Sequence, residues 1–114
     1  MHELSIVMSI VDLANKEATK HQASAIEEIE LDIGCLSGID MDSFDFAWQQ
    51  AIKRTILESA KRKVNRIEGK ARCSDCETFF PMVQFYDSCP NCNSHLSEIV
   101  SGKELKIKSL VLPD

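Results

Sequence analysis

The 114-residue sequence has no apolar run long enough to span a membrane, no secretory leader pattern, no internal repeat and no low-complexity segment. It also lacks a nucleophile with a nearby general base, a phosphate-binding loop and an open catalytic metal site. We therefore expect neither a membrane protein nor an enzyme. With 44% hydrophobic and 27% charged residues, the composition is typical of a soluble globular protein of about one domain, and we expect a cytoplasmic location.

Charge is distributed unevenly along the chain. The net charge is −5, but residues 1–50 carry ten acids and two lysines, whereas residues 51–72 carry eight bases and two acids. Such a basic stretch most often faces water. The functional alternative is a docking surface for an acidic partner, and nucleic acid is the less favoured candidate because the whole chain is acidic.

Four of the five cysteines form two Cys-x-x-Cys pairs, Cys73 with Cys76 and Cys89 with Cys92. Two such pairs can bring four thiolates to one tetrahedral point, which predicts a closed structural zinc site in a small ribbon with a short hairpin between the pairs. The residue after each pair often adopts a left-handed backbone, which asparagine tolerates better than glutamate. Here these residues are Glu77 and Asn93.

Alternatives remain for this site. Iron also accepts four cysteines, so a rubredoxin-like electron carrier is possible on chemical grounds. His95 follows Cys92 by three residues and could exchange with a thiolate, although four sulfurs already complete the shell. We expect the fifth cysteine, Cys35, to be a small buried hydrophobic residue.

The chain begins Met1-His2-Glu3, which offers a second set of metal donors. The α-amino group, the His2 ring and the intervening amide nitrogens can lie in one plane, an arrangement that suits Ni(II) or Cu(II) better than zinc. Glu3 can add an axial carboxylate or orient the imidazole. Because His2 is bulky, we expect the initiator methionine to be retained. Taken alone this pattern is weak, since many chains begin Met-His by chance.

Hydrophobic periodicity predicts two helices and four strands. The first helix is expected at 4–20, with Leu4 and Met8 in its apolar stripe. The second is expected to begin at a cap within 40–43 and to end between 53 and 60. The strands are expected at 28–34, 61–68, 96–100 and 105–111. This order predicts an α+β fold in which two helices pack on one face of a small mixed β-sheet, with an inserted zinc ribbon. The predicted domains are 1–69 plus 101–114, and 70–100 for the ribbon.

The whole chain resembles the HypA/HybF family of nickel-insertion accessory proteins for hydrogenase maturation. The resemblance rests on MHELSIVMSIV, IELDIGCLSGID, FAWQQAI, the pairs CSDC and CPNC, and SGKELKIKSLVL. It implies a nickel metallochaperone, with nickel at Met1, His2 and Glu3 and zinc at the four paired cysteines. It further implies work beside a HypB-type GTPase and contact with the hydrogenase large-subunit precursor; in some relatives the same machinery also serves urease. The alternative is a zinc-ribbon module that binds nucleic acid or a transcription complex through residues 53–72.

Overall fold

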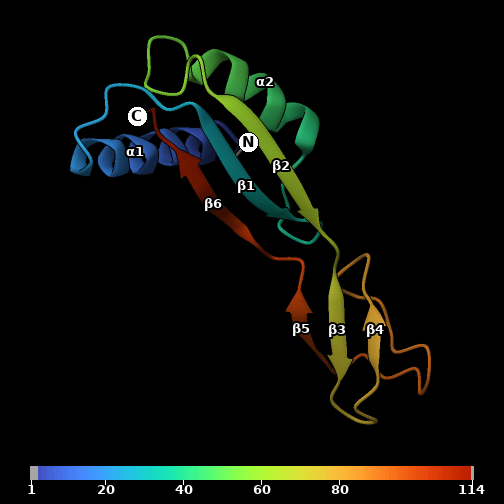
Figure 1. Ribbon diagram of the computed structural model, residues 1–114. Coiled ribbons are helices and arrows are strands. Elements are labelled where there is room, and N and C mark those ends of the chain that lie inside the picture. Colours follow the sequence, from blue (N-terminus) through green and yellow to red (C-terminus); the bar gives the residue numbers. More distant parts are fainter. Residues whose placement is uncertain (1–2, 114) are drawn as a thin grey trace. The chain divides into compact units, whose positions relative to one another are not determined.

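A computed structural model describes residues 3–113 of the chain (Figure 1). Its elements, in order, are α1 (Glu3–Lys20), β1 (Glu28–Gly34), α2 (Met41–Ala51), β2 (Lys61–Ile67), β3 (Lys70–Cys73), β4 (Phe79–Pro81), β5 (Ser97–Ser101) and β6 (Leu105–Val111). Among the described residues, no helix combines the length and the apolar character that crossing a membrane requires.

The chain divides into two compact units. The helical unit comprises 1–31, 39–65 and 106–114, and the ribbon unit comprises 32–38 and 66–105. The ribbon unit therefore contains the loop after β1 in addition to the segment around the cysteines. The domain bounds expected from the sequence, with the ribbon at 70–100, stay a prediction.

The first sheet has the strand order β2-β1-β6, with β1 in the centre (Figure 1). Backbone hydrogen bonds join Lys61 N to Glu27 O and Cys35 N to Ile67 O, so β2 runs parallel to β1. The bonds from Glu27 N to Val111 O and from Gly34 N to Glu104 O make β6 antiparallel. The sheet is mixed, as predicted.

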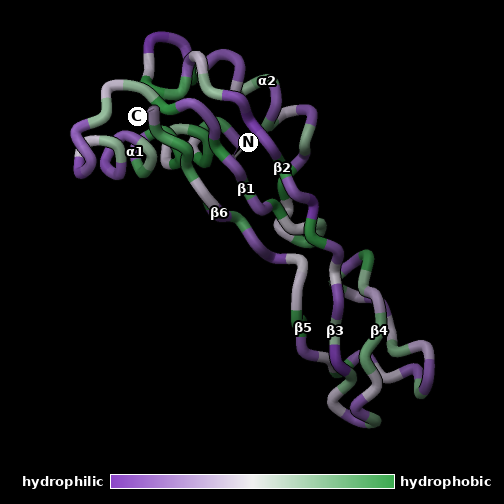
Figure 2. Tube along the Cα trace, viewed as in Figure 1, coloured by the Kyte–Doolittle hydropathy of each residue, from purple (hydrophilic) through white to green (hydrophobic). Residues whose placement is uncertain are grey.

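Both helices cover the same face of this sheet. Residues alternate along β1 between buried and more exposed, with Ile29, Leu31 and Ile33 inside. The helices bury apolar residues of their own: Val7, Ile10, Ala14 and Ala18 from α1, and Phe44, Ala47 and Trp48 from α2. The opposite face is polar, and Figure 2 shows β2 as largely hydrophilic. The predicted fold class is confirmed.

The centre of the polar face is a cluster around Glu30. Its carboxylate accepts a hydrogen bond from the Asn65 side chain (2.7 Å), and the Lys63 and Lys108 ammonium groups lie 3.9 and 3.7 Å away. The Asn65 bond is the largest cause that lowers the pKa of Glu30, and the two lysines add to it. Glu30 on β1 thus pairs with bases on both flanking strands.

Two expectations about the helices are wrong. The second helix ends at Ala51, before the predicted range of 53–60, because the chain turns through a left-handed Arg54 (φ 62°). The Thr55 hydroxyl bonds to the Ile52 carbonyl (2.6 Å), a local contact that competes with helical hydrogen bonding. In α1, Leu4 and Met8 are 51% and 56% exposed, so they do not belong to the core.

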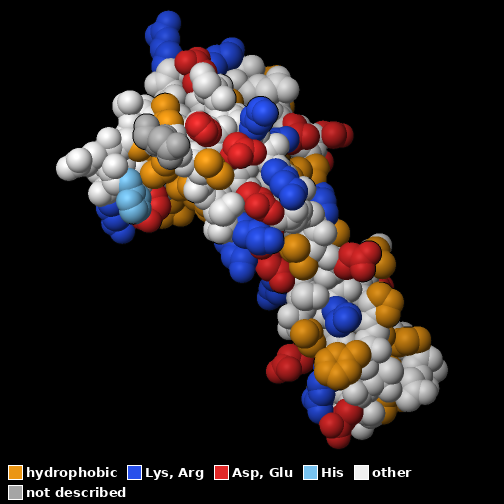
Figure 3. Space-filling view, viewed as in Figure 1, with side chains coloured by type: hydrophobic (Ala, Val, Ile, Leu, Met, Phe, Trp, Pro, Cys, Tyr) orange, Lys and Arg blue, Asp and Glu red, His pale blue; other side chains and the backbone are white. Residues whose placement is uncertain are grey.

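The ribbon unit contains a second, antiparallel sheet with the order β4-β3-β5. The strands that flank the cysteines supply most of it, and only the three residues of β4 come from the segment between the pairs, where a hairpin was expected. Its small apolar core consists of Leu36, Ala71, Phe80 and Met82 together with buried cysteines. Figure 3 shows several hydrophobic side chains on the surface of this unit, and Phe79, Phe85 and Tyr86 are each more than half exposed.

Candidate metal centres

The two Cys-x-x-Cys pairs sit in two turns of the same construction. In the first, the Glu77 N–H donates to the Cys73 carbonyl (2.9 Å); in the second, the Asn93 N–H donates to the Cys89 carbonyl (2.8 Å). Glu77 and Asn93 both have a left-handed backbone, with φ of 63° and 62°. These are the two positions at which the sequence predicted that conformation. Each turn directs both of its sulfurs to one side.

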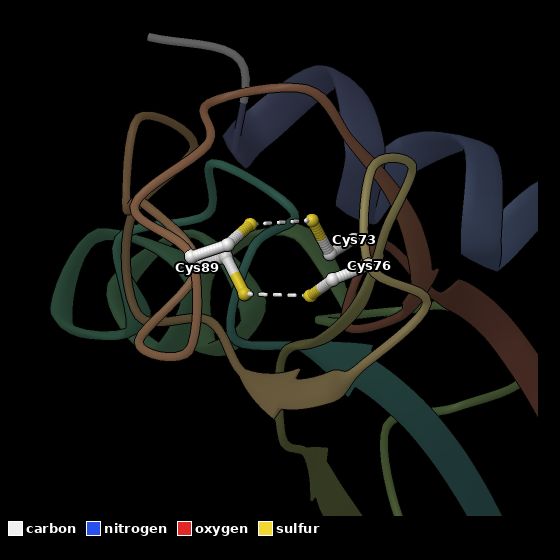
Figure 4. A group of neighbouring side chains, drawn as sticks. Cys73, Cys76 and Cys89 are labelled. Atoms are coloured by element: carbon white, nitrogen blue, oxygen red, sulfur yellow. Dashed lines mark hydrogen bonds between the residues drawn. The ribbon is translucent and has the colours of Figure 1, made fainter.

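The four sulfurs of the pairs converge on one point. Cys73 and Cys92 have sulfurs 3.5 Å apart, Cys76 and Cys89 have sulfurs 3.6 Å apart, and all four lie within 4.8 Å of one another. Figure 4 shows the sulfurs of Cys73, Cys76 and Cys89 turned toward each other. Four sulfurs at about 2.3 Å from a tetrahedral zinc ion would stand roughly 3.8 Å apart. The cluster therefore fits a four-thiolate metal site with no open position.

The surroundings of the cluster differ from one cysteine to the next. Cys73 and Cys89 are fully buried in the ribbon core, Cys76 is partly buried and Cys92 is exposed. The Asn91 N–H lies 3.4 Å from the Cys89 sulfur, a contact of the kind that stabilises a thiolate ligand.

In the absence of metal, the Cys76 and Cys92 thiols have very different pKa values because their surroundings differ. The Thr78 hydroxyl and the Asn91 side chain lie 3.2 and 3.5 Å from the Cys76 sulfur, and these bonds, Thr78 first, lower the pKa of Cys76 to about 6. A backbone hydrogen bond from Ser94 lowers the pKa of Cys92, but the neighbouring sulfurs and desolvation outweigh it and raise the pKa to about 12. Four adjacent sulfurs cannot all carry negative charge without a cation, so metal binding must release protons.

Two other residues singled out in the sequence lie outside this cluster. His95 is exposed, and the metal-ligand group found among residues 3–113 consists of the four cysteines without it. Cys35 is exposed, so the expectation that it is buried is wrong. The buried residue of that loop is its neighbour Leu36, which is 4% exposed and packs in the ribbon core. Sequence periodicity gave no signal for this, because the loop lies beyond the alternation of β1.

The predicted nickel donors are only partly described. Met1 and His2 lie outside the described residues. Glu3 is the first residue of α1, and its carboxylate accepts a hydrogen bond from the Asp40 N–H at the start of α2 (3.2 Å). This bond is the main cause that lowers the pKa of Glu3. The carboxylate is therefore anionic at neutral pH and fixes the first turn of α1 against the beginning of α2.

The basic segment 51–72 is largely engaged within the protein. Arg62 forms an ion pair with Asp45 (2.7 Å) and stacks on the Phe44 and Trp48 rings, 5.8 and 5.3 Å from their centroids. Three further bases contact acceptors: Lys63 contacts Glu30, Arg66 contacts the Ile33 carbonyl and Arg72 contacts Glu77. These contacts engage part of the basic segment within the protein.

Comparison with known proteins gives a consistent result. Residues 1–112 match the family described as HypA, "Hydrogenase/urease nickel incorporation, metallochaperone, hypA". The chain is 49% identical over 112 residues to the hydrogenase maturation factor HypA of Parabacteroides distasonis, covering 98% of this chain and 97% of that protein. It is 39% identical to the same factor of Prosthecochloris aestuarii, with 98% and 99% coverage.

Solved structures agree with these sequence matches. The solution structure of the Ni metallochaperone HypA from Helicobacter pylori is similar with a TM-score of 0.68 and 29% identity, covering 98% of this chain and 97% of that one. A second solution structure of a HypA protein is similar with a TM-score of 0.71 and 30% identity, covering 99% and 97%.

Proposed function

The chain belongs to the HypA family of hydrogenase and urease nickel-incorporation metallochaperones, and from this we propose that it binds Ni(II) at Met1, His2 and Glu3 and delivers the ion to the [NiFe]-hydrogenase large subunit during maturation. The observation that carries the proposal is the family match over residues 1–112, which includes the N-terminal donors and both cysteine pairs. Nickel is cargo in this role and must leave again, so the protein acts as a carrier and not as an enzyme.

The chemistry of the N-terminal donors supports nickel at this end of the chain. The α-amino nitrogen, the His2 ring and the amide nitrogens between them form a compact set that favours square-planar Ni(II). Nickel affinity should be modest and should decrease as the pH is lowered, because these nitrogens must lose protons before they bind. Glu3 is already hydrogen-bonded to the Asp40 N–H, so we assign it the task of positioning the donors on α1, with axial coordination as its second role.

We assign zinc to Cys73, Cys76, Cys89 and Cys92 in a structural role. The sulfur spacing fits zinc, and the filled shell leaves no place for a reactive water. Zinc bound there would fix the ribbon, whose apolar core is small. Iron is the competing ion for four thiolates, and metal analysis of protein produced with both ions available would distinguish them.

The proposed partners follow from the same family role. They are a HypB-type GTPase, which supplies or receives nickel, and the hydrogenase large-subunit precursor; urease accessory proteins are a further client in organisms that have urease. We place the protein in the cytoplasm, where thiols stay reduced and available for zinc. We propose no membrane partner and no nucleic acid.

The test is the substitution His2→Ala in untagged protein, which removes the imidazole donor. We expect it to abolish nickel binding in calorimetry while zinc content and the circular dichroism spectrum stay unchanged. His21→Ala is the matched control, since His21 is an exposed histidine beyond the end of α1. A tag fused ahead of Met1 should act like His2→Ala, because it removes the free α-amino group. Full nickel binding by the tagged protein would refute the N-terminal site.

A further inference from the structure

The helical unit contains a groove that the core does not fill. The first turn of α1 and one side of α2 line an open groove of about 570 Å³ that is mostly apolar, to which Leu4, Phe46 and Ala47 contribute. Asp42, Phe46 and Gln50 line it from α2 at a spacing of four residues, so they lie on one side of that helix. We call this feature the Leu4–Phe46 groove.

Large apolar side chains are exposed along the Leu4–Phe46 groove. Leu4 is 51% exposed and Phe46 is 67% exposed, and Met8, one turn after Leu4 on α1, is 56% exposed. Single exposed apolar residues need no explanation, but Leu4 and Phe46 come from two adjacent helices and line one hollow, with Met8 one turn further along α1, and such a grouping marks an interaction site. Leu4 and Met8 follow the helical spacing of a packed face although the core of their own chain does not bury them.

The polar border of the Leu4–Phe46 groove is acidic. Glu3 and Asp42 both line it, and Asp12 continues the row of Leu4 and Met8 along α1. One base, Lys53, reaches its far end, where the ammonium nitrogen lies 3.5 Å from the Gln50 side-chain oxygen. An occupant with apolar residues and positive charge at its edge therefore complements the groove.

We propose that the Leu4–Phe46 groove binds an amphipathic helix of a partner protein, with apolar residues facing Leu4 and Phe46 and with Lys or Arg at its border. A groove between two helices accepts a third helix in this manner, by anchors spaced three and four residues apart. This inference rests on the proposed function in one respect. Because Glu3 lines the groove, a bound helix lies against the turn that carries the proposed nickel donors, and partner binding then accompanies nickel transfer.

The test uses two synthetic 18-residue amphipathic helices as probes, one built from Leu and Lys and the other from Leu and Glu. Each is titrated into isotopically labelled, zinc-loaded protein and followed by chemical-shift changes. We expect the Leu/Lys peptide to bind with shifts centred on Leu4, Met8 and Phe46, more weakly as salt is added, and the Leu/Glu peptide not to bind. Phe46→Ser and Leu4→Gln should each weaken binding about tenfold or more, because they remove an apolar anchor.

Phe85→Ser is the matched control, since Phe85 is 58% exposed in the ribbon unit; it should leave peptide binding unchanged. Phe46 is exposed, so its replacement should preserve the fold, which circular dichroism checks. Equal binding by Phe46→Ser and wild type, or preference for the Leu/Glu peptide, would overturn the proposal. So would a dimer in sedimentation equilibrium that Phe46→Ser abolishes, because the occupant would then be a second copy of the chain. Nickel titration of Phe46→Ser separates this proposal from the function, since its nickel binding should stay intact.

Discussion

Gly69→Ala should destabilise the ribbon unit by about 2–4 kcal/mol. A Cβ atom at Gly69 would stand 2.1 Å from the Met82 carbonyl oxygen and 2.7 Å from the Leu36 side chain. The Met82 backbone is held in place by the hydrogen bond from its N–H to the Gly69 carbonyl (2.9 Å). Relieving the clash therefore requires the start of β3 to separate from the chain that leaves β4.

The destabilisation expected for Gly69→Ala combines two effects. Forcing a methyl group into a packed site typically costs about 1–3 kcal/mol, and a broken buried hydrogen bond adds about 1 kcal/mol. Leu36 and Met82 are 4% and 2% exposed and belong to the same apolar cluster as Cys73 and Cys89. Because that cluster supports the sulfurs, the lost stability of the ribbon unit should appear as a decrease of roughly 30- to 700-fold in zinc affinity.

Competition with a chromophoric zinc chelator at neutral pH measures this affinity. Gly38→Ala is the control, because a Cβ atom at Gly38 meets nothing within 4 Å and the only penalty is its left-handed backbone, with φ of 81°. That penalty is about 1 kcal/mol, which limits the loss of affinity to roughly fivefold. Equal zinc affinities for the two variants would refute the reasoning, since they would show that the close approach at Gly69 does not constrain the ribbon.

Two further predictions concern single side chains. Glu77→Gly should tighten zinc binding about twofold in the same chelator competition, because relief of the left-handed backbone outweighs loss of the exposed Arg72 pair. Glu30→Gln should destabilise the helical unit to urea at pH 7, measured by Trp48 fluorescence, and the difference from wild type should shrink as the pH falls below 4.5. The Asn65 bond holds the pKa of Glu30 below its usual 4.5, so the stabilisation is present above that value and is lost as pH falls through the folded-state pKa.

A specific result would contradict each of these two predictions. Weaker zinc binding by Glu77→Gly would mean that the Arg72 ion pair, with its 2.6 Å contact, contributes more than the backbone strain. Asn93→Gly is the control for Glu77→Gly, and it should change zinc affinity little, because asparagine tolerates the left-handed conformation. For Glu30→Gln, a difference from wild type that stays constant from pH 7 until the wild type itself unfolds in acid would exclude titration of this carboxylate as its cause.

The parts of the fold that the sequence predicted are those set by local periodicity. The alternation in β1 follows directly from a strand with one buried face, and α1 follows from the helical spacing of Val7, Ile10, Ala14 and Ala18. The cysteine cluster was predictable for a different reason, since metal-ligand spacing leaves few other arrangements. The left-handed turns at Glu77 and Asn93 follow from the same geometry.

The parts that could not be predicted depend on tertiary contacts. Leu4 and Met8 have the spacing of a core face, and only the packing of α1 against α2 shows that they stay exposed. The end of α2 is decided by the Thr55 hydroxyl and the left-handed Arg54, which compete with a continuing apolar stripe. For the nickel site, the sequence supplies the donor chemistry of Met1 and His2, and the structure adds only the Asp40 contact of Glu3.

The loop that joins β1 to α2 explains why the ribbon needs more than its cysteines. Leu36 lies two residues after β1, yet its side chain completes the apolar cluster around Cys73 and Cys89, and its N–H donates to the Gly102 carbonyl (2.7 Å). A ribbon cut out as residues 70–100 would lack both contacts and would retain a core of very few side chains. Zinc would then have to supply nearly all of its folding free energy. The segment 32–38 therefore belongs to the zinc-binding unit in energetic terms, although it is distant from the cysteines in sequence.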